Sequence, residues 1–326
     1  MHPERPEATR SDPKHPLGAL ASVHSDTKSG FARAHDLALH AGNLPVLPGV
    51  AARVAALDPA AEGYFDGLLA IAQQDPNFAV HLIRAANASA SAPGSAVLTV
   101  RQAMVRLGAA DCARLVSGVV GAQGYVPRSR GDLDLWRHAL QVAVAARTLA
   151  AMAPTLHVAP DEAYLAGLLH DIGRFVMLVS AIDDLHRVEE THWHTPEELL
   201  HAEHRLLGYD HVQLGVLVCR HWTLPAALCD LVVHHHDYAM PESRQHASAS
   251  HLVRIVQLAD RLSVMLMMHP QVISLEPAAL ATEITRHGLR REWRTPPVDP
   301  TRIADRLPRI AAESAALFDA LAPAGA

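Results

Sequence analysis

Repeated helix-start signals divide this chain into short helices. Asp75-Pro76 has the pattern of an N-cap followed by proline at the first helical position, and Thr99-Val100-Arg101-Gln102 has that of a capping box. A second capping box, again with proline at the first helical position, stands at Thr195-Pro196-Glu197-Glu198. Alanine and leucine favour helices, and only 4% of the residues are aromatic, which argues against a β-sandwich or a β-barrel. The sequence therefore predicts an all-α fold.

The spacing of these signals predicts four regions. Residues 1–40, with several prolines and no sustained period, are expected to be a flexible leader. Residues 41–125 contain five short helical patterns and form a first lobe. A break rich in glycine separates this lobe from a longer helical run over residues 131–268, with helices expected at 133–152, 161–180, 196–207, 209–222, 225–236 and 248–268. Residues 270–326 carry two weaker helical patterns, and the sequence leaves open whether this extension packs on the bundle or mediates contacts.

Charge and cysteine content limit the classes of partner and compartment. A net charge of −6 and a pI near 6.4 give no electrostatic reason to expect nucleic acid or an anionic membrane as a partner. The three cysteines, Cys112, Cys219 and Cys229, are an odd number without a C-x-x-C pair, which suits a reducing compartment. We find no apolar run of the ~20 residues that a membrane helix needs and no signal peptide. The expected location is the cytoplasm.

An adjacent histidine and aspartate inside a strongly apolar helix mark the most unusual point of the chain. The segment reads Ala166-Gly167-Leu168-Leu169-His170-Asp171-Ile172-Gly173-Arg174. Burying a carboxylate costs several kcal/mol unless a positive or hydrogen-bonding group pairs with it. A divalent metal ion is one efficient partner, because it takes both an imidazole nitrogen and a carboxylate oxygen.

Further histidines and aspartates stand on neighbouring predicted helices. They are Asp134 and His138, then His211, the triple His234-His235-His236, and Asp260. Successive side chains on a helix turn by about 100°, so at most two histidines of the triple can face one pocket, and we favour His235 and His236. Inward positions of a helical bundle can bring such side chains together into a metal site.

Several motifs resemble the HDOD branch of the HD superfamily of metal-dependent phosphohydrolases. In family order they are Leu44-Pro45-x-Leu47-Pro48, Gln74-Asp75-Pro76, Arg84-Ala85-Ala86-Asn87-Ala88, Gln102-Ala103-x-x-x-Leu107-Gly108, Trp136-Arg137-His138, Gly167-Leu168-Leu169-His170-Asp171-Ile172-Gly173, Leu207-Gly208-x-Asp210-His211, Trp222-x-Leu224-Pro225 and His234-His235-His236. Each motif is weak alone, but together they are highly specific.

The resemblance implies an HD-like bundle with an N-terminal helical lobe, which makes residues 41–268 the HDOD domain and 131–268 its metal-site lobe. It also implies a role in bacterial signalling and a ligand set of His138, His170, Asp171, His211, His235, His236 and Asp260, with Asp134 as a weaker candidate. HD relatives that cleave cyclic dinucleotides follow their paired histidines with a Gly-Tyr-Pro segment. This chain instead reads His236-Asp237-Tyr238-Ala239-Met240-Pro241, so cleavage of cyclic di-GMP is not expected.

Three interpretations of the site stay open at this point. The first is a regulatory HDOD protein that keeps a metal pocket and works through contacts with signalling proteins. The second is an active phosphohydrolase for a nucleotide or cyclic nucleotide, in which Asp171 bridges two ions of Mn, Fe, Ni or Zn and Arg174 contacts a phosphate. The third is a metal-free scaffold in which Arg174 pairs with Asp171. Independently of these interpretations, Asp260 could be a salt-bridge partner of Arg261 or Arg254, and Asp134 is expected to be a surface carboxylate favoured by the helix dipole.

Overall fold

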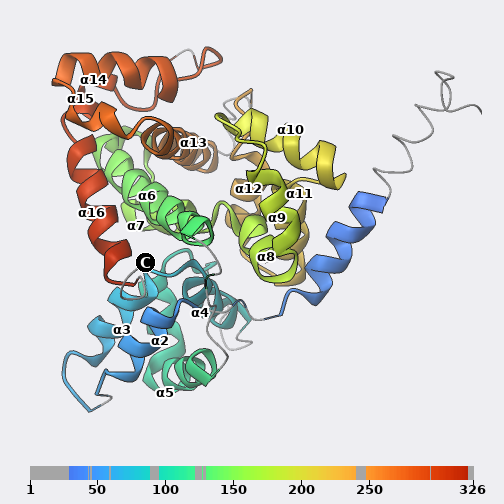
Figure 1. The fold of residues 1–326 in the computed structure, drawn as a ribbon. Helices are drawn as coiled ribbons and strands as arrows, with labels where there is room; N and C mark the ends of the chain where they lie inside the picture. The colour runs from blue at the N-terminus through green and yellow to red at the C-terminus, as the bar shows by residue number, and fades with distance from the viewer. Residues whose placement is uncertain are drawn as a thin grey trace, which may run out of the picture.

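Helices account for all regular secondary structure in the part of the chain that the structure describes. This computed structural model describes residues 29–42, 44, 46–58, 60–88, 95–121, 127, 130–239, 247–293 and 295–321. The prediction of an all-α fold is confirmed. Two lobes and a C-terminal extension surround a shared apolar core (Figure 1).

The N-terminal lobe consists of short helices packed against a long, kinked one. Its helices are α2 (Pro48–Ala55), α3 (Tyr64–Ala72), α4 (Pro76–Ala88) and α5 (Val100–Gly121). Gly108, with φ 75°, forms a kink inside α5 between two helical segments. Most of the predicted break after this lobe, residues 122–126 and 128–129, lies outside the described residues.

The second lobe carries every predicted metal ligand. Its helices are α6 (Arg130–Met152), α7 (Pro160–Leu169), α8 (Ile172–Ser180), α9 (Ile182–Glu189), α10 (Pro196–Leu207), α11 (His211–His221), α12 (Ala226–His234) and α13 (Ala247–Met268). A short 3₁₀ turn, Pro154–Leu156, joins α6 to α7. Helices α6, α7 and α13 pack together at the centre, and α11 packs against both α8 and α12 (Figure 1).

The single helix predicted over 161–180 is wrong, because the chain breaks between α7 and α8. Asp171 has φ −95° and ψ 27°, outside helical geometry, and α8 starts after it. The hydrophobic periodicity of the sequence could not reveal this break, because α7 and α8 are buried on all their faces near it. The stretch Pro160–Ser180 is in fact long and apolar enough to cross a membrane by composition, contrary to our expectation, but 89% of its most apolar window is buried inside the bundle. This burial identifies the stretch as core.

Residues 29–40, which we assigned to a flexible leader, form a helix that packs on the second lobe. Arg33 forms an ion pair with Asp184 at 2.6 Å, and Trp222 Nε1 donates to the carbonyl of Ala41 at 3.1 Å. The buried positions of this helix are Gly30, Ala34 and Ala38, which give only a weak apolar period. The rest of the predicted leader, residues 1–28, lies outside the described residues.

The C-terminal extension packs on the bundle, which settles the alternative that the sequence left open. It contains η3 (Pro270–Ser274), α14 (Pro277–Glu283), a π-helical turn η4 (Ile284–Gly288), α15 (Pro300–Ala304) and α16 (Leu307–Asp319). Helix α16 lies along α6, where Glu313 pairs with Arg147 and the Phe318 ring lies 4.4 Å from the guanidinium of Arg137 (Figure 1).

Asp75 joins the two lobes. It stands immediately before α4, is fully buried, and its carboxylate accepts from the backbone N–H of Phe78 at 2.8 Å, as expected for an N-cap. The same carboxylate accepts from the backbone N–H of Leu47 and from Trp136 Nε1 on α6, each at 3.2 Å. One side chain therefore fixes α4 against the helix that carries His138.

Candidate metal centre

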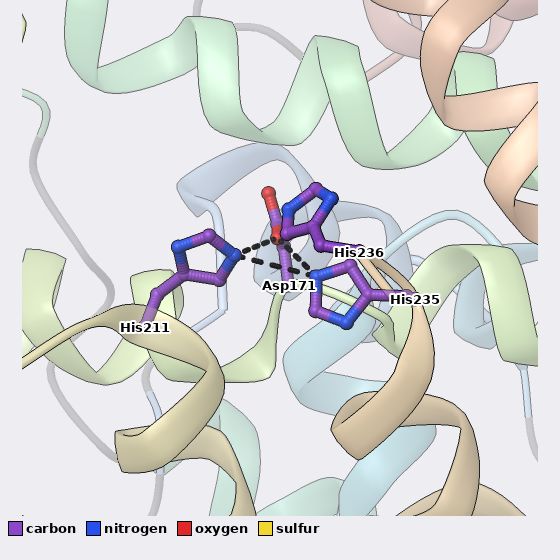
Figure 2. Close-up of side chains that lie close together, drawn as sticks. All are labelled: Asp171, His211, His235 and His236. Atoms are coloured by element: carbon purple, nitrogen blue, oxygen red, sulfur yellow. Dashed lines mark hydrogen bonds and ion pairs between the residues drawn. The ribbon is translucent and has the colours of Figure 1, made fainter. Parts of the chain in front are cut away.

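The structure brings together all seven residues of the expected ligand set, from five parts of the fold. His138 lies on α6, His170 and Asp171 at the break between α7 and α8, His211 at the first turn of α11, His235 and His236 directly after α12, and Asp260 on α13. Figure 2 shows Asp171 facing His211, His235 and His236.

Two groups of donor atoms share Asp171. One group is Asp171 with His211, His235 and His236, and the other is Asp171 with His138 and His170. In each group the donor atoms lie within 4.8 Å of one another. Ligand atoms at ~2.0–2.2 Å from one ion lie at most about 4.4 Å apart, so small side-chain shifts would place each group around an ion. The sharing of Asp171 matches a carboxylate that bridges two ions.

Hydrogen bonds at Nδ1 orient three of the imidazoles. His170 Nδ1 lies 2.7 Å from the carbonyl oxygen of Gly167, and His235 Nδ1 lies 2.8 Å from that of Val232. A carbonyl only accepts, so each Nδ1 carries the proton. His211 Nδ1 donates to Glu203 Oε2 at 2.7 Å. In His170 and His235 the Nε2 lone pair therefore points inward, as metal-binding histidines require.

His138 is oriented by a relay of two hydrogen bonds. Its Nδ1 lies 2.9 Å from Ser263 Oγ, and that hydroxyl donates to Gln141 Oε1 at 2.7 Å. Because the hydroxyl proton is used on Gln141, the serine oxygen accepts from His138 Nδ1. Nε2 of His138 is thus left as a lone pair, 3.3 Å from Nε2 of His170.

Two acceptor nitrogens this close repel each other unless a cation lies between them. The Nε2 atoms of His211 and His235 are also 3.3 Å apart, but here the proton that His211 carries, because Glu203 and Asp171 raise its pKa to about 9, bridges the two nitrogens in the metal-free protein. Nitrogens at 2.0–2.1 Å from a tetrahedral metal ion are separated by about 3.3 Å. Both pairs therefore have the spacing of two ligands of one ion.

Asp260 and His236 leave polar atoms unpaired in the interior. Asp260 Oδ1 lies 3.3 Å from His138 Nε2, and Asp260 Oδ2 lies 3.7 Å from His236 Nδ1. Among the described residues, neither Asp260 Oδ2 nor His236 Nδ1 has a hydrogen-bond partner. Buried polar atoms without partners are costly, and a metal ion would satisfy both. The residues present therefore fit a metal ion.

The expected alternative for Asp260, a salt bridge to Arg261 or Arg254, is not what the side chains show. Arg261 donates to the carbonyls of His287 and Gly288, and Arg254 donates to that of Thr295. Asp260 instead faces the histidines.

The electrostatics favour neutral imidazoles at His170 and His236 beside charged carboxylates. Burial lowers the pKa of His170 to about 4 and, together with His235, holds the pKa of His236 well below its usual range. Burial alone would raise the pKa of Asp171, but His170 and His211 hold it well below its usual value. His211 is the exception, since Glu203 and Asp171 overcome burial and raise its pKa to about 9.

Arg174 does not form a tight pair with Asp171. Its Nη1 lies 3.8 Å from Asp171 Oδ2, beyond hydrogen-bond distance, while its Nη2 pairs with Glu189. Both nearby carboxylates raise the pKa of Arg174 against the effect of burial. The ion pair that the scaffold interpretation requires is therefore present, although it is longer than a hydrogen bond.

Two other predicted positions lie outside the donor groups. Asp134 pairs with Arg137, and its side chain is 45% exposed. His234 is turned away from the centre, as the helical geometry indicated, and its Nδ1 lies 3.3 Å from Asp237 Oδ2.

Sequence reasoning missed Glu203, the buried partner of His211. Its Oε2 accepts from both the backbone N–H and Nδ1 of His211, at 2.9 and 2.7 Å. The sequence did carry a signal for this role, because Glu203 lies on the buried, apolar face of α10, next to Ala202.

A cavity of about 620 Å³ opens beside the centre. His138 and Arg174, from the candidate metal centre, line this cavity. The donor group of His138, His170 and Asp171 therefore adjoins open space.

Comparison with known proteins places this fold and site in a family. The family model described as the HDOD domain matches residues 44–238, which is 195 of 326 residues. The chain belongs to the HDOD domain family. The HDOD match includes the candidate ligands from His138 to His236, whereas Asp260 lies beyond it.

Solved structures share the HDOD fold with this chain. The MmoQ response regulator from Methylococcus capsulatus is 23% identical, with a TM-score of 0.59 over 77% of this chain and 96% of that one. A virulence factor from Campylobacter jejuni is 16% identical, with a TM-score of 0.57 over 86% of this chain and 96% of that one. A search of curated proteins by sequence gives no match. At these identities the likeness shows the fold alone.

Proposed function

We propose that this HDOD protein is a signalling protein that binds one or two divalent metal ions and acts mainly through contacts with other signalling proteins. Membership of the HDOD family supports the signalling role, and a response regulator is among the structures that share the fold. The observation that carries the metal site is the pair of donor groups that meet at Asp171.

The donor set indicates which metals the site would take. Imidazole nitrogens and carboxylate oxygens without a thiolate suit Mn, Fe, Ni or Zn. His211, His235 and His236 would hold one ion, and His138 and His170 a second, with Asp171 between them. Asp260 would supply oxygens at the edge of both groups.

Metal content tests this proposal directly. Untagged protein, dialysed against each metal in turn, is expected to retain one to two ions per chain by elemental analysis. Asp171→Asn keeps the size of the side chain but removes the charge and one donor oxygen, so it should lose most of the metal. Asp237→Asn, a change at an exposed carboxylate two residues after His235, is the matched control and should retain the full content. Folded wild-type protein that retains no metal would overturn the proposal.

A second candidate function is phosphoester hydrolysis, favoured by the cavity that adjoins the centre. Bound divalent ions would lower the pKa of a coordinated water and neutralise charge that develops on a phosphate. Arg174 is positioned between this cavity and Asp171 and would hold a phosphate oxygen.

Assays on mononucleotides, cyclic mononucleotides and cyclic dinucleotides separate the two functions. Metal-loaded protein without turnover would support the regulatory role. Turnover that disappears in Asp171→Asn, with fold and Asp237→Asn activity retained, would make the protein an enzyme.

A further inference from the structure

Two of the three cysteines face each other across the hairpin that α11 and α12 form. The start of α11 lies beside the end of α12, so the two helices run antiparallel. They pack very closely, because a Cβ at Gly215 would lie only 2.8 Å from Val232 Cγ1. About one turn further along α11 comes Cys219, and about one turn back along α12 comes Cys229. Opposite positions of the hairpin therefore bring the two thiols together.

The contacts of the two thiols agree with this register. Leu224, in the turn between the helices, contacts both cysteines: its backbone N–H donates to the carbonyl of Cys219 at 2.9 Å, and its own carbonyl accepts from the Cys229 thiol at 3.5 Å. The Cys219 thiol also donates a hydrogen bond to the sulfur of Cys229. A disulfide requires Cβ atoms about 3.5–4.5 Å apart, and sulfur atoms already in contact are close to that geometry.

The two thiols differ in exposure and in acidity. Cys219 is fully buried, whereas Cys229 is half-buried and can meet a small solute. The hydrogen bond between them raises the pKa of Cys219 and lowers the pKa of Cys229. The thiolate is the form that reacts with oxidants, so Cys229 is suited to react first. Cys219 is then placed to react second.

We propose that Cys219 and Cys229 are a redox modification site, at which hydrogen peroxide converts the two thiols to a disulfide that a thiol reductant reverses. First, the Cys229 thiolate attacks a peroxide oxygen; the S–O bond forms, the O–O bond breaks, and the leaving hydroxide takes up a proton. Second, the Cys219 thiol attacks the sulfur of that sulfenic acid; the S–S bond forms, the S–O bond breaks, and water leaves with the thiol proton. The two thiols lose two electrons and the peroxide gains them.

The turn that this disulfide closes is part of the contact between the lobes. Trp222 lies in the turn, and its ring centroid is 4.5 Å from the guanidinium of Arg84 on α4. Its Nε1 donates to the carbonyl of Ala41. Oxidation would therefore fix the segment through which the second lobe contacts the N-terminal lobe. In a reducing compartment such a disulfide is transient, as redox-sensing disulfides are.

Peroxide treatment of the full chain tests this site, with a chelator present so that bound metal takes no part. After denaturation the free thiols should fall from three to one per chain, and the intact mass should fall by the mass of two hydrogen atoms. Peptide mapping should find Cys219 linked to Cys229, and dithiothreitol should restore all thiols. The disulfide should raise the midpoint of thermal unfolding by about 4 °C or more, because it closes a short loop between two packed helices.

Three alanine variants separate the roles of the cysteines. Cys229→Ala should slow the loss of thiols about tenfold or more, since the remaining cysteines are buried. Cys219→Ala should still react at Cys229, where dimedone captures the sulfenic acid, but should form no disulfide within the chain. Cys112→Ala changes a buried cysteine of α5 and is the matched control, which should form the disulfide at the wild-type rate.

Mapping of the wild-type protein can overturn the proposal without any variant. Protein that keeps all three thiols, or that forms disulfide-linked dimers, would contradict the pairing within the chain. Sulfinic acid at Cys229 beside a reduced Cys219 would show that the second thiol does not reach the first. An unchanged rate of thiol loss in folded Cys229→Ala would remove Cys229 as the reactive thiol.

Discussion

Glu203 acts on the candidate centre through His211. It is fully buried and accepts two hydrogen bonds from that histidine, so it fixes the ring orientation and the Nδ1 proton. Glu203→Gln keeps an acceptor oxygen but removes the charge. We expect metal affinity to fall about 10- to 100-fold, as is usual when the partner of a metal-bound histidine is changed. Equilibrium metal titration measures this.

A control for this change lies on the same helix. Glu198 Oε2 accepts from the backbone N–H of His194 in the capping box that starts α10, and glutamine serves equally at this position. Glu198→Gln should therefore leave metal affinity unchanged. An equal loss of affinity in both variants would show that α10 as a whole, rather than the Glu203 charge, supports the site.

The raised pKa of His211 predicts a pH dependence of metal binding. Glu203 and Asp171, against burial, raise this pKa to about 9, so at pH 7 the metal-free protein carries a proton on His211. A metal ion must displace that proton, so affinity should rise about tenfold per pH unit from pH 6.5 toward 9 and then level off. Because burial lowers the pKa of His170 to about 4, this residue adds no dependence in that range.

Calorimetry in buffers of different ionisation enthalpy counts the protons released. One proton released per ion bound by the His211 group at pH 7 is expected. A flat affinity between pH 6.5 and 8.5 would contradict the assignment of His211.

At the scale of elements, contact between the backbones of α8 and α11 sets the position of His211. A Cβ at Gly173 would overlap the carbonyl oxygen of His211 and lie 2.9 Å from the backbone N of Gly215. Neither backbone can move without shifting α11. Gly173→Ala should therefore destabilise the protein by about 1–3 kcal/mol and reduce metal content, because His211 moves away from Asp171.

Denaturant unfolding and elemental analysis of the same preparation check this prediction. Gly63→Ala is the control, since a Cβ there meets no atom within 4 Å. If Gly173→Ala retained wild-type stability and metal content, α8 and α11 would not be held by this contact.

At the scale of the whole molecule, Asp75 and the C-terminal helix hold the lobes together. The segment directly after α16 reaches back to the N-terminal lobe, where a Cβ at Gly49 would overlap the carbonyl oxygen of Leu321. Leu321 is fully buried there.

Asp75→Ala should destabilise the protein by roughly 2–4 kcal/mol, because it removes the carboxylate that accepts from the buried N–H donors of Leu47, Phe78 and Trp136. Thermal or urea unfolding measures the loss. Asp66→Ala removes a carboxylate whose side chain is 79% exposed and should change stability by less than about 0.5 kcal/mol. A loss of that small size in Asp75→Ala would mean that the lobes do not depend on this residue.

The sequence by itself determined the helical class and the caps at Asp75 and Thr195, and its family motifs predicted the seven candidate ligands. These features follow from patterns within one or two helical turns, together with motifs in a fixed order, so no knowledge of packing is needed. The helix of residues 29–40 was not predicted from the sequence, because its buried positions are glycine and alanine, whose apolar signal is weak.

Only the tertiary structure decided how the donors meet. The break at Asp171, the pairing of Glu203 with His211, and the cavity beside His138 depend on helices that are far apart in sequence and packed side by side. Local periodicity carries no information on those distances. It is the packing of α6, α11 and α13 around the α7–α8 junction that turns scattered histidines and aspartates into one candidate centre.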